Sequence, residues 1–164
     1  MTAPPALLTE RMWGVLADKL PDRLPAELCI QVEECLKFLA IASERAASFF
    51  PLDAAVDEVW HELITETREY QGLCSRLPGG RFLHHSAITL DEYVQRSNRS
   101  AVVCELLEWI PVYVRTFGDF TPEAAEYWVI CRFLRAELGL SLDDINRIGR
   151  ESRTGEQSVS ADIR

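Results

Sequence analysis

The sequence predicts an all-α fold, a single compact bundle of about six or seven helices with a short extended segment. Apolar residues recur at three- and four-residue steps through several long segments, which is the period of an amphipathic helix. Pro and Gly mark several of the boundaries between these segments. Strict alternation of apolar and polar residues occurs only over short stretches. We therefore expect no sheet larger than a short two-stranded pairing near Phe82.

The first half of the chain holds three predicted helices. The first spans residues 7–20 and starts near Pro5 or Thr9, and the second spans residues 26–49 after a turn bracketed by prolines. The third begins after Asp53 as its N-cap and continues to about Leu77, where Pro78-Gly79-Gly80 ends it.

The second half continues the helical pattern. A capping box from Thr89 to Glu92 starts a helix, and the pattern resumes over residues 102–117, where Pro111 predicts a kink or a helix boundary.

The last helices have clear end signals. Thr121 followed by Pro122 is an N-cap with proline at the first helical position, and Gly139 is the matching C-cap. A final short helix covers residues 141–148. We therefore expect one helical domain over residues 1–149 and a disordered polar tail over residues 150–164.

Composition excludes several classes of function. With 164 residues, the chain is long enough to bury a core without disulfides or metal. The net charge of −9 argues against a nucleic-acid partner, whose phosphates require clustered cations. No apolar run approaches the roughly 18 residues of a membrane span, and the N-terminus lacks signal-peptide features, so we expect a cytoplasmic protein without membrane contact.

Cysteine and lysine usage adds two further expectations. The five cysteines are an odd number with no C-x-x-C pair, which favours buried thiols over disulfides: Cys29, Cys35, Cys74, Cys104 and Cys131. Only Lys19 and Lys37 among the 17 basic residues are lysine. This bias indicates GC-rich codons and favours a bacterial source.

All three histidines, His61, His84 and His85, lie within 25 positions of one another. A lone helical histidine is more often structural than functional, but three in one stretch raise the odds of a metal or catalytic site to about even. His84 and His85 follow the Pro-Gly-Gly turn in a segment too short for a helix, residues 81–85, which we call the His-His segment. Neighbouring side chains of an extended segment point to opposite sides, so one of His84 and His85 faces the helix, and we prefer His85.

Three stripes are expected on the helix that contains Trp60 and His61. One is apolar and buried, and one, formed by Glu58, Glu62, Glu66 and Glu69, is acidic and solvated. The third stripe contains Asp57, His61, Ile64 and Arg68. Because Asp57 and His61 are neighbours at i and i+4, Asp57 either shares a metal with His61 or holds the second nitrogen of that imidazole and sets its tautomer.

The residues Val56-Asp57-Glu58-Val59-Trp60-His61, then Tyr70 and Cys74, then Gly80-Arg81-Phe82-Leu83-His84-His85, resemble the signature of the glycine-rich domain-containing protein-like family. The resemblance covers residues 30–88 and implies a helical domain with no settled reaction. It also leaves Cys74 open for a role in the site. Some members have a second histidine shortly after the Trp-His pair, and this chain has Leu63 there, which puts a ligand of the family in doubt.

Two functional hypotheses follow. The first is a metal-binding protein or small metal-dependent enzyme that holds zinc or iron through His61, His84, His85 and Asp57 and acts on a small molecule or peptide. Its catalytic candidates are Asp57, His61, Arg68 and Tyr70. Of these, Arg68 could bind an anionic group of the substrate. The second is a helical adaptor that binds a protein partner, in which the same residues form a structural hydrogen-bond network. Histidine acid/base catalysis without metal is a third, weaker hypothesis.

Overall fold

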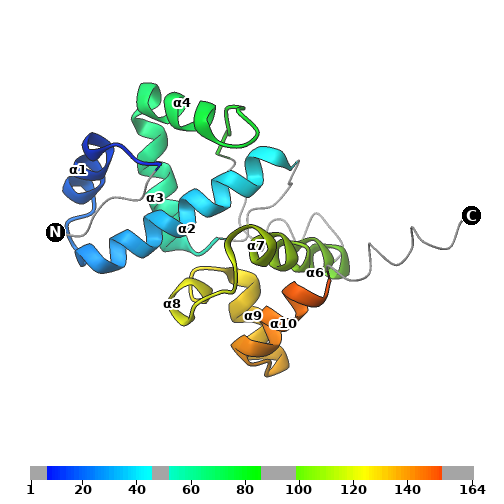
Figure 1. The fold of residues 1–164 in the computed structure, drawn as a ribbon. Helices are drawn as coiled ribbons and strands as arrows, with labels where there is room; N and C mark the ends of the chain where they lie inside the picture. The colour runs from blue at the N-terminus through cyan, green and yellow to red at the C-terminus, as the bar shows by residue number, and fades with distance from the viewer. Residues whose placement is uncertain (1–6, 46–51, 86–98, 153–164) are drawn as a thin grey trace, which may run out of the picture. The chain divides into compact units, whose positions relative to one another are not determined.

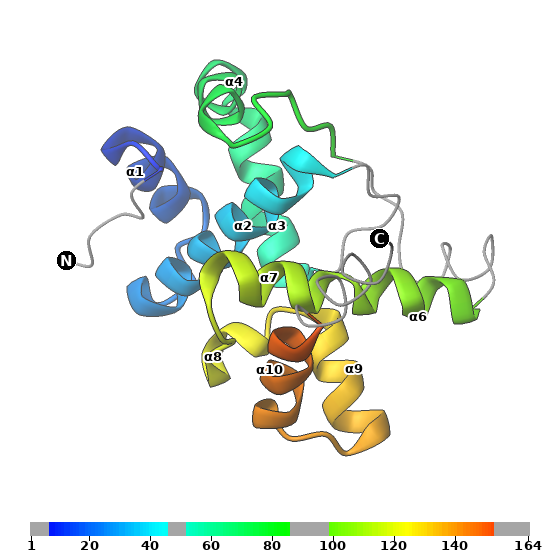
Figure 2. The ribbon, with the colours of Figure 1, turned by 45° about the vertical axis from the view of Figure 1, so that its right-hand side comes forward.

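A computed structural model of the chain describes residues 7–45, 52–85 and 99–152 (Figures 1 and 2). These residues form helices joined by turns, and no β-strand occurs among them. The predicted all-α class is therefore confirmed. The chain divides into two compact units, an N-terminal unit of residues 1–87 and a C-terminal unit of residues 88–164. The predicted capping box at Thr89 lies outside the described residues.

Four helices form the N-terminal unit: α1 (Glu10–Lys19), α2 (Pro25–Glu44), α3 (Ala54–Thr65) and α4 (Thr67–Arg76). Residues on most sides of α2 are buried, and α3 is the central helix of this unit because it packs against α1, α2 and α4. Rings of α2 and α3 meet where Phe38 and Trp60 lie edge to face, with centroids 5.1 Å apart. Both side chains are fully buried. Burial of two large aromatic rings makes this contact a major part of the core.

The predicted single helix from Asp53 to Leu77 is wrong in one respect. Asp53 does cap it, because its Oδ1 accepts the Ala55 N–H at 2.8 Å. However, the backbone at Glu66 has φ −88° and ψ 62°, which is outside the helical range, and divides the segment into α3 and α4. We call this point the α3–α4 joint. The apolar period did not reveal it because Leu63 and Tyr70, on either side, are both buried.

The expected acidic stripe is not simply solvated. Glu62, Glu66 and Glu69 form ion pairs with Lys19 and Arg11 of α1. In addition, Arg23 pairs with Glu58. Sequence period alone could not show this, because the cations come from a segment more than 30 residues away.

The C-terminal unit contains α6 (Arg99–Leu107), α7 (Trp109–Phe117), α8 (Pro122–Ala125), α9 (Val129–Leu138) and α10 (Leu142–Glu151). Its core is aromatic: the rings of Tyr113 and Phe120 stack with centroids 3.7 Å apart, and Trp128 meets both edge to face. The described residues thus contain more helices than the six or seven expected, because several of the predicted helices are divided.

One of these helix divisions was predicted from the sequence, and another was not. The helix boundary predicted near Pro111 occurs at Glu108, which places Pro111 in the first turn of α7, where a missing N–H costs no hydrogen bond. The break between α8 and α9 was not predicted. It falls at Trp128, whose backbone is extended at φ −109° and ψ 113° while its side chain is buried among aromatic rings. Packing of this ring overrides the local helical pattern.

The helix ends in this unit follow their residues. Thr121 Oγ1 accepts the Ala124 N–H at 3.1 Å, and Gly139 ends α9 with a positive φ of 64°. Both predictions are confirmed. In contrast, α10 extends to Glu151, so Arg150 and Glu151, the first residues of the expected tail, are helical. Residues 153–164 lie outside the described part of the chain.

Cysteine burial was only partly predicted. Cys35, Cys74 and Cys131 are buried, Cys29 is partly exposed and Cys104 is exposed. On α6 the buried positions are Val102 and Leu106, and Cys104 lies on the other side of the helix. None of the helices in the described ranges is long and apolar enough to cross a membrane.

Asn146 of α10 connects that helix to the loop before α8. Its amide is 5% exposed and pairs with the backbone of Phe120, accepting the N–H at 2.8 Å and donating to the carbonyl at 3.0 Å. We expect Asn146→Ala to lower the free energy of unfolding by about 2–3 kcal/mol, since two buried backbone groups lose their partner. Urea denaturation measures this. A loss below about 0.5 kcal/mol would contradict the proposed role.

Candidate functional site

The candidate site is in the N-terminal unit, where the His-His segment lies beside α3. Asp53 caps the start of α3. The residues Asp57, Trp60 and His61 follow within about the first two turns of this helix. Trp60 is buried, Asp57 is partly exposed and His61 is exposed. The tryptophan therefore anchors the helix in the core, and the two polar residues face away from that core.

Contacts with the end of α2 hold the start of the His-His segment. Arg81 donates from Nε to the Ser43 carbonyl at 2.8 Å and from Nη2 to the Ala42 carbonyl at 2.6 Å, and it also reaches the Arg45 carbonyl. The last carbonyls of a helix have no partner within the helix, and the guanidinium supplies one. In addition, the Gly79 N–H donates to Ser43 Oγ at 3.0 Å.

A buried hydrogen-bond chain holds the middle of the segment. The indole Nε1–H of Trp60 donates to the Tyr70 hydroxyl at 2.9 Å, and that hydroxyl donates to the Leu83 carbonyl at 2.8 Å. Burial raises the pKa of Tyr70 well above its ordinary value, more than the hydrogen bond from Trp60 lowers it. Tyr70 therefore keeps its proton and acts as a fixed connector between α3, α4 and the segment. This chemistry does not suit an acid/base catalyst near neutral pH.

His85 is the histidine that faces α3, as we expected. Its Nε2 lies 2.8 Å from Oδ1 of Asp57, and its ring contacts Trp60 edge to face with centroids 4.6 Å apart. The side chain of His85 is 14% exposed and that of Asp57 is 48% exposed, so the pair is sheltered on the histidine side and reachable from solvent on the carboxylate side. A carboxylate can only accept, so Nε2 of His85 is the protonated nitrogen.

The other two histidines have different surroundings. The ring of His61 lies perpendicular to that of His85, with centroids 5.6 Å apart, so these two residues belong to one cluster. In contrast, His84 is exposed and its ring contacts Phe82, with centroids 4.9 Å apart. Phe82 and His84 are exposed, whereas Leu83 is buried and His85 is partly buried, and the ring of Phe82 also contacts that of Tyr70, with centroids 5.2 Å apart.

Arg68 does not continue the stripe formed by Asp57 and His61. It lies beyond the α3–α4 joint, on α4, where it is exposed. Behind the site, burial raises the pKa of the Cys35 thiol and the charge of Asp57 adds to the rise. Cys35 is therefore a protonated thiol, which is a poor nucleophile and a poor metal ligand.

We tested whether the cluster fits a metal ion. Two imidazoles on one zinc, with Zn–N of about 2.0–2.1 Å, have ring centres roughly 5–6 Å apart, and the 5.6 Å between His61 and His85 fits this range. Two ligand atoms on a tetrahedral zinc lie about 3.3 Å apart. The 2.8 Å between Asp57 and His85 is shorter and corresponds to a hydrogen bond. Among the described residues, no three or more His, Cys, Asp or Glu side chains are already arranged to hold a metal ion.

Sequence reasoning missed two features that shape the site. One is the contact of Arg81 with the end of α2, although its position directly after Gly-Gly was visible. The other is the set of cations on α1 that pair with α3 and α4. Neither could be assigned from the sequence, because their partners lie 36 or more residues away in the chain.

Comparison with known proteins corrects the family expected from the signature. The sequence model of the UCP032817-like family matches residues 8–104, which include α1, α2, α3 and α4. The resemblance to the glycine-rich domain-containing protein-like family was therefore wrong. It depended on a short pattern of histidines and aromatic residues, whereas the family model matches all four helices of the N-terminal unit and continues beyond that unit.

No curated protein matches the chain significantly, and no solved structure does so either. The family description names no activity, so function has to be argued from the site itself. Since the match covers more than half of the sequence, the chain belongs to the UCP032817-like family.

Proposed function

We propose that the N-terminal unit binds a divalent transition metal, zinc or iron, through His61 and His85, with Asp57 holding the imidazole of His85. The observation that carries this proposal is the 2.8 Å contact between Asp57 and His85 beside the ring of His61. A histidine that ligates a metal commonly donates its other ring N–H to a carboxylate, which fixes the tautomer. In the neutral imidazole with Nε2 as the donor, Nδ1 of His85 carries no proton and can bind an ion.

The sequence predicted that Asp57 would share a metal with His61 or orient that histidine. Its contact is with His85 instead, and the distance favours an orienting role for Asp57. The contact with His85 is about 0.5 Å shorter than the separation of two zinc ligands. His61 is exposed, so its ring can rotate toward the ion without loss of core packing. We leave His84 out of the proposed ligand set, because its exposed ring contacts Phe82, whereas the rings of His61 and His85 lie against each other.

Two imidazoles leave further coordination positions for water or for an oxygen or nitrogen atom of a small molecule or peptide substrate. The half-exposed carboxylate of Asp57 lies on the solvent side of the pair, where such a ligand would enter. The bound metal would polarise that group. The contribution of the chain is to fix one imidazole by Asp57 and by the Trp60–Tyr70–Leu83 hydrogen bonds.

Metal titration of untagged protein tests the proposal. We expect a rise in melting temperature and stoichiometric binding for wild type, because an ion that binds only the native state must stabilise it. His61→Ala and His85→Ala should abolish or strongly reduce binding. Asp57→Asn should weaken affinity by about 10–100-fold, the range found for residues that orient a metal ligand.

His84→Ala is the matched control, because it removes a neighbouring imidazole that faces away from α3. Its affinity should equal that of wild type. The proposal fails if wild type offered zinc, ferrous iron, copper, nickel and manganese in turn shows neither binding nor thermal stabilisation. It also fails if His84→Ala loses as much affinity as His85→Ala.

The second candidate function is a helical adaptor for a protein partner, and the buried Trp60–Tyr70–Leu83 chain favours it. In that case the Asp57–His85 contact is a further structural hydrogen bond. His85→Ala would then cost about 1–3 kcal/mol of stability with or without metal. Addition of chelator to the wild-type protein would leave its melting temperature unchanged.

A further inference from the structure

The two parts of the proposed metal site depend on helices that meet at the α3–α4 joint. His61 and Asp57 belong to α3. The position of His85 depends partly on α4, because the Tyr70 hydroxyl of α4 holds the Leu83 carbonyl two residues earlier. The angle between α3 and α4 therefore affects the distance between the two histidines.

The α3–α4 joint is supported locally by the buried hydrogen bond from Trp60 of α3 to Tyr70 of α4 and by the Glu66 N–H, which donates to the Leu63 carbonyl at 3.2 Å. Its backbone leaves the helical range at Glu66, which ends α3 and begins α4, and no side-chain hydrogen bond caps the start of α4. A free helix start leaves several N–H groups without partners in the helix. Contacts from elsewhere in the unit can add to these bonds in fixing the angle between α3 and α4.

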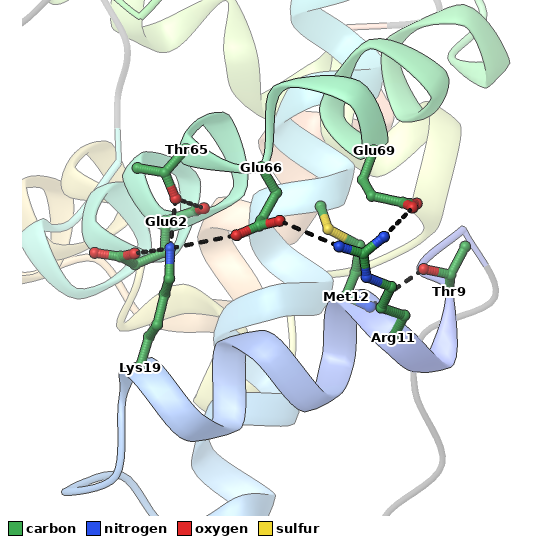
Figure 3. Close-up of polar contacts among 8 residues, drawn as sticks. All are labelled: Thr9, Arg11, Met12, Lys19, Glu62, Thr65, Glu66 and Glu69. Carbon is green, nitrogen blue, oxygen red and sulfur yellow. Dashed lines mark hydrogen bonds and ion pairs between the residues drawn. The ribbon is translucent and has the colours of Figure 1, made fainter.

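Helix α1 provides such contacts on the α3 side. Lys19 Nζ lies 3.0 Å from the Glu62 carboxylate and 2.5 Å from the Thr65 hydroxyl, both in the last turn of α3. The same ammonium group is 3.8 Å from Oε1 of Glu66 (Figure 3). One cation thus joins the end of α3 to the joint.

The opposite end of α1 provides matching contacts on the α4 side. Arg11 is 3.8 Å from the other oxygen of Glu66 and 3.3 Å from Glu69, in the first turn of α4. Figure 3 shows the carboxylate of Glu66 between Lys19 and Arg11. In addition, Arg76 near the end of α4 donates to the Leu7 carbonyl at 3.1 Å. Helix α1 therefore contacts both sides of the joint and the joint itself.

Apolar contacts hold α1 in place independently of these charges. Met12 is 3% exposed and Leu16 is 1% exposed, so one side of α1 lies in the core. Exposed ion pairs contribute little to stability, typically below about 1 kcal/mol each. Loss of Arg11 and Lys19 should therefore leave α1 attached, and remove mainly the constraint on the angle between α3 and α4.

We propose that α1 fixes the α3–α4 joint, with Arg11 and Lys19 as positioning residues that act through Glu66 on the separation of His61 and His85. The inference rests on the proposed metal site, but the effect of α1 on the α3–α4 joint does not require metal. Because the pairs are exposed, the constraint weakens with ionic strength. Metal affinity of this unit is thereby coupled to charge on a helix that supplies no ligand.

Metal affinity at low and high salt gives the first test. We expect Arg11→Ala/Lys19→Ala to weaken zinc binding about 3–10-fold at low salt, the size expected for two weak ion-pair sets. The charge-conserving Arg11→Lys/Lys19→Arg should recover most of that loss. The difference from wild type should largely vanish near ~1 M salt, where the Debye length is about 3 Å.

Glu33→Gln is the matched control. It removes an exposed ion pair with Lys37, 2.9 Å long, that lies entirely on α2. Its zinc affinity should equal that of wild type at both salt concentrations. If it loses as much affinity as the double alanine variant, the effect is a general charge effect, and the positioning role is overturned.

Thiol labelling gives a test without metal. Cys74 of α4 is 1% exposed, and labelling in a Cys29→Ser/Cys104→Ser background leaves only buried thiols. The double alanine variant should label Cys74 several-fold faster than wild type, because α4 moves more freely. Cys131, in the C-terminal unit, should keep its rate and is the internal control.

The outcomes separate the two proposals. An unchanged Cys74 rate overturns the role of α1, whatever metal binding does. A faster rate in a protein whose wild type binds no metal supports the role of α1 at the joint and overturns the proposed metal function. A faster rate together with unchanged affinity, in a protein that does bind metal, overturns the coupling between α1 and the site.

Discussion

Gly79→Ala is expected to lower the free energy of unfolding of the N-terminal unit by about 3 kcal/mol. A Cβ atom at this position would lie 1.9 Å from the backbone carbonyl oxygen of Ser43 and 2.5 Å from its carbonyl carbon. Backbone atoms of α2 cannot rotate away as the end of a side chain could. The Pro-Gly-Gly turn must therefore move, and the contacts of Arg81 with the end of α2 are stretched or lost.

Urea denaturation followed by far-UV circular dichroism measures this loss. Gly72→Ala is the matched control, since its Cβ would meet only the end of the Arg76 side chain at 3.6 Å, an ordinary contact. In the middle of α4 the same substitution should stabilise by up to about 1 kcal/mol through helix propensity. Equal effects of the two substitutions would contradict the close approach of the turn to α2. Gly79→Ala should also weaken metal binding, because the turn carries the His-His segment.

Gly149→Ala is expected to destabilise the C-terminal unit by about 1–3 kcal/mol. Helices α7 and α10 pack closely there, and an added Cβ would lie 2.5 Å from Cγ2 and 2.9 Å from Cβ of Val114. Val114 is 7% exposed and β-branched, so its side chain has little freedom to move aside. The overlap should exceed the gain of up to about 1 kcal/mol from replacing a helical glycine.

A double-mutant cycle with Val114→Ala tests this contact directly. Val114→Ala alone should be destabilising, since it opens space in a packed interface between helices. In that background, Gly149→Ala should cost much less, or even stabilise, because the added methyl group fills the space. A cost that is independent of residue 114 would show that the clash is not the cause.

The chain itself determined the features that depend on contacts within a few residues. Asp53, Thr121 and Gly139 act as the expected caps, because cap geometry requires only a side-chain oxygen near the next N–H groups or a backbone that accepts positive φ. Two-residue alternation likewise predicted that only one of His84 and His85 would face the helix, and the structure shows that it is His85. The helical class followed from the apolar period of several segments together.

The composition of the candidate site could be predicted only in outline. Placing Asp57 and His61 one turn apart requires just the helical period, and these two residues do lie on α3. The pairing of Asp57 with His85 required the turn and the contacts of Arg81 and Tyr70, which span 13 or more residues. For that reason the sequence left His84, Arg68 and Tyr70 among the candidates, whereas the structure places them in three different environments.

Only the tertiary structure decided where two of the helices break and which residues distant in the sequence contact each other. Glu66 and Trp128 interrupt helices without any Gly or Pro at either position, so local preference gave no signal there. The groups that surround these breaks are distant in the sequence: the α1 cations lie beside Glu66, and the aromatic core surrounds Trp128. Helix periodicity, caps and alternation are short-range properties that the sequence determines by itself. The direction of each helix after a break depends on packing energy shared among segments, which exists only once the chain has folded.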